Sequence, residues 1–304
     1  EVWLRLNTVL PRCLWIMTIN ALLDIINGNA KTVTVTQENV LVDPLQVLRC
    51  DIRVFRCGPI LKIILRILEA SLAASRSQLS RHLLDKPLLE KSGQLTSDAE
   101  REELKNALVA AQESASLQIL LEACLETEED QLKPELMWSL REVRSIICSF
   151  LHQIFISEPS LAKLVHFQGY PRELLPVTVQ GIPSMHICLD FIPELLSQAS
   201  LEKQIFAVDL VSHLSIQYAL PKAMSIARLC VNTLSTLLSV LPSDMRLELF
   251  QPVLKSLVRI CTAFPSLLED VTSLLLQLAR ICESQASLGH CWNDTAILGE
   301  GAYV

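Results

Sequence analysis

Glycine, aromatic residues and charged residues are all scarce in this sequence. Its 304 residues include 8 glycines, 5% aromatic residues and 19% charged residues. So few glycines exclude a collagen, a glycine-rich linker and a set of glycine-rich phosphate-binding loops. The sequence contains no H-E-x-x-H or G-x-S-x-G motif, no P-loop and no dinucleotide-binding fingerprint. These absences argue against an enzyme and against a bound cofactor.

Basic charge is also in deficit, since the formal net charge is −7 and the isoelectric point is near 5.5. A nucleic-acid surface needs clustered lysine and arginine, together with aromatic planes on which bases stack. We therefore expect no direct DNA contact. The longest stretch without charge, Leu174 to Leu189, is too short to span a membrane and contains Pro176, Gly181 and Pro183. The expectation is a soluble chain without a membrane partner.

Apolar residues, by contrast, are abundant. They make up 50% of the chain, and the mean hydropathy is +0.37. A chain of this length buries a large core, and this surplus indicates that some of its apolar surface faces another subunit. The ten cysteines have no spacing typical of a disulfide framework, so we interpret them as reduced, buried side chains of an intracellular protein.

Apolar residues recur at helical spacing along most of the chain, which predicts an all-α fold. Residues 14–26 form the first expected helix, and residues 31–36 an extended connector. A helix that begins at Asp43-Pro44 should end at Gly58-Pro59, where the next helix starts and continues to Leu84. A capping box over residues 97–100 should begin a long helix that extends to about Leu125. An acidic turn is expected over residues 126–134. Residues 135–156 should form the next helix.

From Ser157 onward, prolines stand near the start of each apolar segment, which is where helices accept them. They are Pro159, Pro171, Pro183, Pro221, Pro242 and Pro265. Helices of about 15 to 22 residues with short connections approach the 40 to 47 residues of a HEAT or armadillo repeat. We therefore predict a HEAT/armadillo-like α-solenoid of antiparallel helix pairs, with a compact multi-helix bundle as the alternative.

The predicted helices and connections divide the chain into four parts. Residues 1–84 form an N-terminal helical segment of the solenoid, and residues 85–134 comprise a polar connector, the long helix and the acidic turn. Residues 135–283 carry the solenoid repeats. Residues 284–304 are expected to be a disordered tail, because their composition is polar.

The spacing of the cysteines does not indicate a metal or catalytic site. Cys50 and Cys57 lie seven residues apart, which favours core packing on one helix face. Cys282, His290 and Cys291 lack a fourth zinc ligand. We therefore predict no metal site and no catalytic residue.

The spacing of the histidines does not indicate such a site either. His186 and Cys188 would point in different directions on a helix, so they could not share a proton. His166 and His213 have no neighbouring carboxylate at the spacing of a metal site or triad and are interpreted as packed histidines. Among the charged groups, Arg141, Arg144, Arg172 and Arg228 receive no role, and the acidic run from Glu126 to Asp130 is expected to be solvated.

Several segments of the sequence resemble the Integrator complex subunit 2 family. They are residues 58–63, 73–76, 162–171, 173–195, 201–207, 216–222 and 263–265. The resemblance covers most of residues 58–283, whereas residues 284–304 depart from the family. Because members of that family are much longer, the resemblance implies that the chain is a C-terminal portion.

The resemblance also implies a function. It implies a non-catalytic scaffold subunit of a nuclear complex that processes the 3′ ends of small nuclear RNAs and attenuates transcription by RNA polymerase II. The expected partners are other Integrator subunits, with RNA polymerase II and protein phosphatase 2A reached through the complex.

Four residues are candidates for partner contacts, because aromatic and methionine side chains are favoured in interface cores. They are Tyr170, Met185, His186 and Tyr218. Ordinary packing between helices is the competing interpretation of each. Two further functional alternatives remain: RNA binding in the solenoid groove, which needs a local basic stripe, and a hydrolase or metal enzyme, which needs clustered titratable groups in a pocket.

Overall fold

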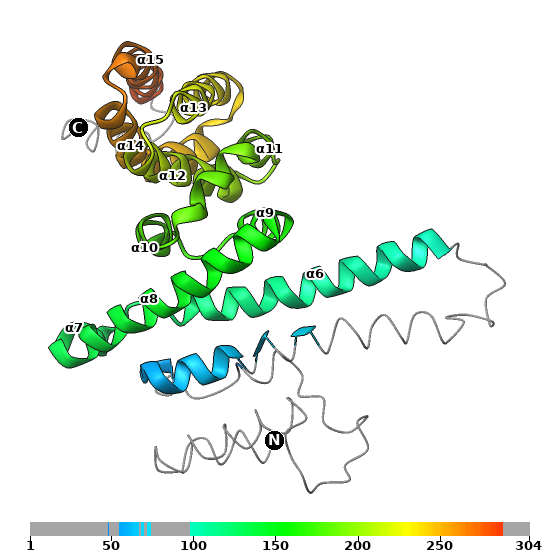
Figure 1. Ribbon diagram of the computed structural model, residues 1–304. Coiled ribbons are helices and arrows are strands. Elements are labelled where there is room, and N and C mark those ends of the chain that lie inside the picture. Colours follow the sequence, from blue (N-terminus) through cyan, green and yellow to red (C-terminus); the bar gives the residue numbers. More distant parts are fainter. Residues whose placement is uncertain (1–47, 49–54, 67, 70–71, 74–97, 288–304) are drawn as a thin grey trace, which may run out of the picture. The chain divides into compact units, whose positions relative to one another are not determined.

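The computed structural model of the protein describes residue 48 and residues 55–66, 68–69, 72–73 and 98–287 (Figure 1). Throughout these residues the regular structure is helical and no strand is present, so the prediction of an all-α chain is confirmed. The expected helix at 14–26, the connector at 31–36, the helix start at 43–44, residue Cys50 and most of the tail lie outside them. The chain divides into two compact units, Glu1–Val165 and His166–Val304, and each is described by itself.

In the first unit, a helix begins at Gly58 directly after a turn at Arg56, so the predicted break at this point is confirmed. Helix α6 (Asp98–Glu122) and helix α8 (Pro134–Ser157) lie within three residues of their predicted ends, and they pack against one another. The buried face of α8 includes the predicted Leu140, Val143 and Ile147. In the C-terminal half of α8, the buried face is shifted by one residue from the predicted face. Leu151 and Phe155 are buried, whereas Phe150 and Ile154 were expected to be buried.

The acidic run between these helices is more ordered than predicted. Helix α7 (Glu128–Leu132) occupies it, and Thr127 caps this helix through a reciprocal capping box with Asp130. Three acidic residues in the first turn also favour a helix here, since the amino end of a helix carries partial positive charge. The predicted turn is therefore a short capped helix that packs against α8.

Helix α9 (Pro159–Gln168) carries the chain into the second unit, which opens with short elements. These are the 3₁₀ helix η2 (Arg172–Leu174), helix α10 (Leu175–Gly181), the 3₁₀ helix η3 (Pro183–Asp190) and helix α11 (Ile192–Leu196). The expected helices of 15 to 22 residues are wrong for this stretch. Prolines 171, 176, 183 and 193 recur too closely, and each one restricts the residue before it and removes a backbone donor.

Four long helices follow, as predicted: α12 (Leu201–Gln217), α13 (Pro221–Val240), α14 (Ser243–Ala263) and, after the 3₁₀ helix η4 (Pro265–Leu267), α15 (Leu268–Ser287). Within this unit, helices pack both on their neighbours and on their next-but-one partners: α10 on α12, α11 on α13, α12 on α14 and α13 on α15 (Figure 1). Proline stands at or next to each predicted helix start, although Pro171, Pro183 and Pro265 open 3₁₀ helices.

Helix α12 lies at the centre of the unit, where it contacts α10, α11, α13 and α14. Ten of its 17 residues are buried, and they lie on most of its circumference. Each fully buried leucine, isoleucine, valine or phenylalanine contributes roughly 1.5 to 3 kcal/mol relative to exposure. The core of this unit therefore forms around α12.

Helix α13 is long and apolar enough to cross a membrane by length and composition, and a third of the tested window is buried. Its buried residues, however, recur every three or four positions, as Ala223, Ala227, Val231, Leu234 and Leu238 do. They form one face, whereas serine, threonine and asparagine occupy much of the rest of the helix. This pattern is typical of a packing helix with one exposed face.

Gly169 follows the end of α9 with φ +84°, the left-handed conformation that ends many helices. A methyl group there would meet no atom within 4 Å. The cost of Gly169→Ala is therefore conformational, and we expect a loss of about 1 kcal/mol in the free energy of unfolding. Urea unfolding followed by circular dichroism measures it.

Gly181→Ala is the matched control, because Gly181 ends α10 and is not among the described glycines with positive φ. It should leave stability unchanged or raise it slightly. Equal losses for the two variants would contradict a conformational role for Gly169.

Candidate functional site

The four residues predicted to contact partners lie in two different environments. Met185 is 1% exposed and Tyr170 is 8% exposed, so both pack inside the second unit. His186 is exposed and Tyr218 is half-buried. Their rings meet edge to face with centroids 5.9 Å apart. Of the four residues, His186 and Tyr218 therefore contact one another, whereas Met185 packs in the core.

His186 and Tyr218 share one hydrogen-bond acceptor, the carbonyl oxygen of Pro183. The Tyr218 hydroxyl donates to it at 3.1 Å, and His186 Nδ1 lies 3.2 Å from it. Burial raises the pKa of Tyr218, which keeps its hydroxyl protonated as a donor. The two rings are thus held in place at the start of η3.

Apolar and charged groups adjoin this pair. Leu220, two residues after Tyr218, is 47% exposed, and an ion pair between Lys222 and Asp190 joins α13 to the end of η3. We call His186, Tyr218 and Leu220 the His186 corner. Tyrosine is enriched in protein interfaces, and the exposed leucine two residues further along the chain adds apolar area.

Tyr170 lines a groove of about 630 Å³ on the second unit. Ile205 and Phe206 of α12 line the same groove, and the Tyr170 and Phe206 rings meet edge to face at 5.1 Å. Its charged residues are of both signs: Arg172, Lys203, Glu173, Glu202 and Glu248. The groove therefore does not select a ligand by charge.

A buried polar cluster lies behind this groove. The Tyr170 hydroxyl is 3.2 Å from His166 Nε2 and 3.1 Å from Thr178 Oγ1, and Cys188 Sγ is 3.6 Å from the same His166 nitrogen. His166 is 1% exposed, so its interpretation as a packed histidine is confirmed. Burial raises the pKa of Cys188, which keeps it a thiol. A neutral, enclosed thiol is not an activated nucleophile, and the cluster serves packing.

His186 and Cys188, by contrast, do not meet. They lie on η3, where His186 is exposed and Cys188 is buried, so the prediction that they could not share a proton is confirmed. The histidine that approaches Cys188 is His166, which is 22 residues away in the chain.

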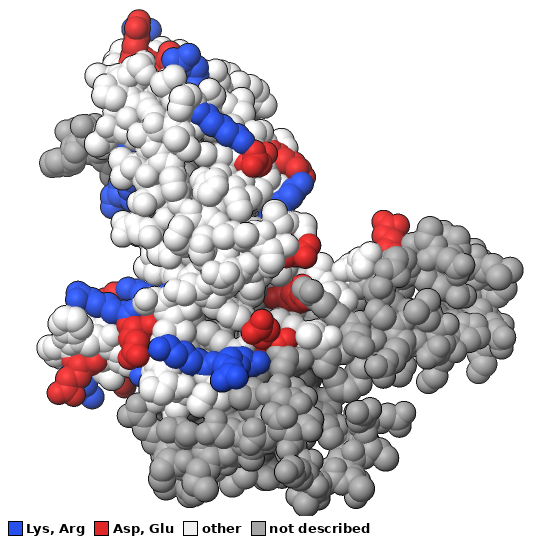
Figure 2. All heavy atoms as spheres, viewed as in Figure 1, with Lys and Arg blue, Asp and Glu red and all other residues white. Residues whose placement is uncertain are grey.

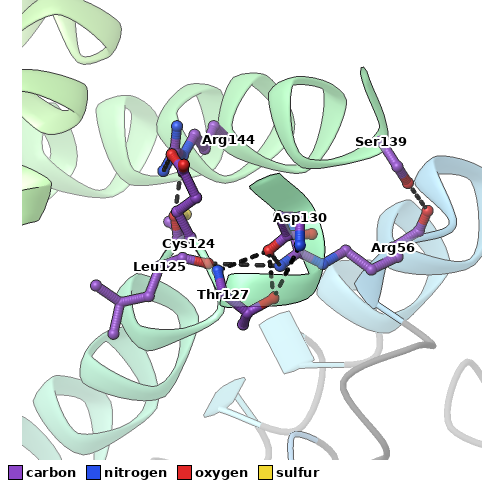
Figure 3. A network of polar contacts seen from close by, with 8 residues as sticks. Arg56, Cys124, Leu125, Thr127, Asp130, Ser139 and Arg144 are labelled. Carbon is purple, nitrogen blue, oxygen red and sulfur yellow. Dashed lines mark hydrogen bonds and ion pairs between the residues drawn. The ribbon is translucent and has the colours of Figure 1, made fainter. Parts of the chain in front are cut away.

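A second polar network joins the segment at Arg56 to α7 and α8 in the first unit (Figure 3). Arg56 Nη2 lies 2.8 Å from Asp130 Oδ2 and donates to the Leu125 carbonyl at 3.4 Å. The Ser139 hydroxyl donates to the Arg56 carbonyl. Nearby, Arg144 Nε donates to the Cys124 carbonyl at 2.9 Å.

Asp130 is therefore 2% exposed, and the expected solvated acidic run is wrong for this residue. Glu126, Glu128 and Glu129 are exposed as predicted. Burial by itself would raise the pKa of Asp130, but hydrogen bonds from Thr127 and the charges of Arg56 and Arg144 outweigh it, and the pKa lies below 3.8. Arg56 Nη1 is buried and has no hydrogen-bond partner among the described residues, so the carboxylate of Asp130 compensates the buried charge of Arg56.

The described cysteines are buried as predicted, except for the half-buried Cys261. Burial raises the pKa of Cys124 and Cys230 to about 12 and that of Cys148 to about 11. In the part of the chain that the structure describes, no three cysteine, histidine or acidic side chains converge as metal ligands. His290 and Cys291 lie outside it.

A third polar cluster connects α12 with α14. Asp209 Oδ1 accepts hydrogen bonds from Ser256 Oγ at 2.9 Å and from Arg259 Nη1 at 2.7 Å. Arg259 Nη1 also lies 3.2 Å from Ser212 Oγ. His213 Nε2 is 3.8 Å from Asp209 Oδ1, so this histidine does have a neighbouring carboxylate, contrary to the prediction.

Comparison with known proteins gives a consistent result over nearly the whole chain. The sequence model of the Integrator complex subunit 2 family matches residues 1–287. Integrator complex subunit 2 of Mus musculus and that of Homo sapiens are each 49% identical, over 94% of this chain. The Drosophila melanogaster protein is 43% identical over 95% of the chain.

The chain belongs to the Integrator complex subunit 2 family. It spans 27% of the mouse and human family members, so it corresponds to about a quarter of their length. The family match starts at residue 1, which extends the resemblance seen in the sequence well before residue 58, and it ends at residue 287.

Sequence patterns missed the polar clusters of this Integrator complex subunit 2 family chain for one reason. Each cluster joins residues that are far apart in the sequence, such as Arg56 with Asp130 and Asp209 with Arg259. Two local signals exist: the spacing of three between Thr127 and Asp130, which a capping box requires, and the spacing of four between Asp209 and His213 on one helix face.

Asp130→Ala should destabilise the first unit by about 3 kcal/mol, because breaking a buried ion pair leaves an uncompensated charge. Since the folded pKa of Asp130 is lowered, the stability it provides is present above pH 3.8 and is lost as pH falls through the folded pKa. Urea unfolding as a function of pH measures both effects. Glu129→Ala, on the exposed side of α7, is the control, and an equal loss in both variants would contradict the role of the pair.

Asp209→Asn should lower the pKa of His213. Burial, and then the charge of Arg259, already hold this pKa below 6.5, and the Asp209 carboxylate opposes them. Removing the carboxylate removes the only opposing influence. Titration of the imidazole by NMR measures the shift, and Arg259→Ala should move the pKa in the opposite direction.

The wild-type chain should also lose stability on acidification below pH 6.5, because the unfolded chain binds the His213 proton more readily than the folded chain does. Identical His213 titrations in the wild type and both variants would show that the cluster does not form.

Proposed function

We propose that this chain is a non-catalytic scaffold segment of the nuclear Integrator complex. In this role it holds other Integrator subunits in place through protein contacts, and thereby supports 3′-end processing of small nuclear RNAs and attenuation of transcription by RNA polymerase II. RNA polymerase II and protein phosphatase 2A are reached through the complex. The observation that carries the proposal is the family match over residues 1–287.

The proposed architecture is an α-solenoid, and contacts between next-but-one helices support it. Asp209 meets Ser256 and Ser212 meets Arg259, so both sides advance by three residues along α12 and α14. Met224 meets Ser266 and Arg228 meets Asp270, so both sides advance by four residues along α13 and the η4–α15 segment. Next-but-one helices therefore run in the same direction at these contacts, which implies that the helix between them returns.

The sequence separations of these contacts also fit repeats. They are 47 residues for both pairs between α12 and α14, and 42 residues between Met224 and Ser266. A HEAT or armadillo repeat has about 40 to 47 residues. The next-but-one contacts also continue in two rows, α10–α12–α14 and α11–α13–α15, as stacked repeats of a solenoid do. This arrangement favours the solenoid within a domain order of residues 1–84, 85–134, 135–283 and 284–304.

The surface favours protein partners. In Figure 2, lysine, arginine and acidic side chains form separate small groups on the described surface, and large areas between them carry no charge. The lysines and arginines in this view do not join into one face, which a phosphate backbone would require. Uncharged surface of this kind is suited to burial against another protein.

The His186 corner is the proposed partner contact of the second unit. His186 and Tyr218 are held by one carbonyl, so ordering them on binding costs little entropy. Leu220 supplies exposed apolar area next to Tyr218. Tyr170 and Met185, by contrast, serve packing.

The test uses the full-length family protein, tagged and purified from nuclei with its complex. His186→Glu combined with Leu220→Glu should reduce the recovery of at least one Integrator subunit about tenfold, which corresponds to about 1.4 kcal/mol. Quantitative mass spectrometry of the purified complex measures the recovery.

Ser239→Glu, exposed near the other end of α13, is the control and should leave recovery unchanged. Unchanged recovery in the double variant would show that the corner contacts no subunit. Absence of Integrator subunits from the wild-type preparation would contradict the scaffold proposal itself.

A further inference from the structure

Large apolar side chains are exposed at the amino end of helix α8 in the first unit. Trp138 is 69% exposed, and Leu132, which ends α7 two residues before α8 begins at Pro134, is 78% exposed. Single exposed apolar side chains are common on protein surfaces, so exposure alone does not identify an interface. The charged groups around Trp138 distinguish this surface from an ordinary one.

Arg141 lies one turn after Trp138, and its guanidinium carbon is 5.2 Å from the centre of the Trp138 ring. A spacing of three places both side chains on one side of the helix, and the attraction of the cation to the face of the ring restricts both. Tryptophan and arginine are among the residue types that contribute most binding energy in interfaces. Because the pair is arranged before a partner binds, its ordering costs little on binding. We call Leu132, Trp138 and Arg141 the Trp138 face.

The charge of Arg141 is not compensated within the described part of the chain. No described carboxylate forms an ion pair with it, and its contact with an aromatic ring supplies no acceptor for its N–H groups. Arg144, one turn later, differs, because it donates to a backbone carbonyl and lies 3.9 Å from Glu126 Oε2. Glu142 is directed elsewhere, since a methyl group on Gly58 would collide with its carboxylate. Arg141 is therefore an exposed cation that can accept a carboxylate from a partner.

We propose that the Trp138 face binds a segment of a partner protein that carries an aspartate or glutamate beside a leucine, phenylalanine or similar apolar side chain. The carboxylate would accept hydrogen bonds from the Arg141 guanidinium, whose planar N–H groups match a carboxylate in pairs. The apolar side chain would cover Trp138 and Leu132, which gains free energy by removing apolar area from water. The inference rests on the proposed scaffold function, because it names the chemistry of one partner contact.

Nearby carboxylates disfavour a nucleic acid on the same surface. A base could stack on Trp138 while a phosphate met Arg141, as in proteins that bind single strands. However, Glu135 is exposed one turn before Trp138, and Glu128 and Glu129 are exposed on α7. Each nucleotide carries a phosphate, so the phosphates next to the one at Arg141 would be repelled by this negative charge. A protein segment can place a single carboxylate at Arg141 without this repulsion.

Site-specific photo-crosslinking in the assembled complex tests the proposal. Ser145 is exposed one turn after Arg141, so the photoreactive residue p-benzoylphenylalanine placed there in the full-length family protein leaves the Trp138 face intact. We expect a crosslink to a segment of another protein that contains aspartate or glutamate next to apolar residues, identified by mass spectrometry. Ser157 is exposed about 18 Å further along α8 and should not give this crosslink.

Charge reversal tests the arginine. Arg141→Glu should lower the yield of the Ser145 crosslink at least tenfold, because like charges then face one another. Arg66→Glu makes the same change of charge at an exposed position on the helix that begins at Gly58, and it should leave the yield unchanged. An equal fall in both variants would overturn the proposal.

Truncation tests the tryptophan. Trp138→Ala should also lower the yield at least tenfold, because it removes the apolar area and the ring on which Arg141 lies. Trp138 is exposed, so the change removes no core contact. Ile156→Ala shortens another exposed apolar side chain, 56% exposed near the end of α8, and should leave the yield unchanged. A yield that Trp138→Ala does not lower would contradict a role for the ring.

Other outcomes overturn the proposal as well. No crosslink at Ser145, a crosslink only to this chain itself, or a crosslink to a segment without a carboxylate would each show that an acidic partner segment does not occupy the Trp138 face. An adduct that nuclease digestion removes would assign the surface to a nucleic acid instead. The same samples report whether Integrator subunits co-purify. Co-purification without the crosslink contradicts the Trp138 face alone, whereas absence of the subunits contradicts the proposed function.

Discussion

Burial of helix α12 on most of its sides is the constraint on which the second unit depends. A helix with apolar residues on most of its circumference is not stable in water unless other helices cover it. Here α10, α11, α13 and α14 cover it, and α15 then packs on α13 and α14. The polar groups of α12 must also find partners inside the protein, and Asp209 finds them in Ser256 and Arg259 on α14. The apolar contacts hold the layers together, and this cluster specifies where along α12 the helix α14 lies.

The first unit uses the same principle with different residues. Arg56 and Asp130 form a buried ion pair between segments 74 residues apart, and the capping box of Thr127 holds the aspartate in position. An ion pair of this kind adds little net stability compared with apolar packing, but the absence of one partner is costly. Its effect is therefore mainly to specify which segments pair. Under the proposed scaffold function, this specificity would present partner surfaces in a fixed geometry.

Under the proposed scaffold function, the surfaces of the chain carry its function. The His186 corner presents two rings that are already held by the carbonyl oxygen of Pro183. The thiol of Cys188, which approaches His166, is held neutral by burial. This agrees with a family whose named members are subunits of a complex.

The sequence by itself determined the helical class, the position of most long helices and the family. Helical spacing of apolar residues and proline at helix starts are local properties, so they survive in the sequence whatever the helices pack against. It did not determine the short helices between Arg172 and Leu196, whose closely spaced prolines were interpreted as ordinary helix starts. Only the tertiary structure decided which polar side chains meet and which surfaces stay open. Asp130 and Glu129 are adjacent acidic residues, yet one is buried against Arg56 and the other is exposed, because burial depends on segments that lie far away in the chain.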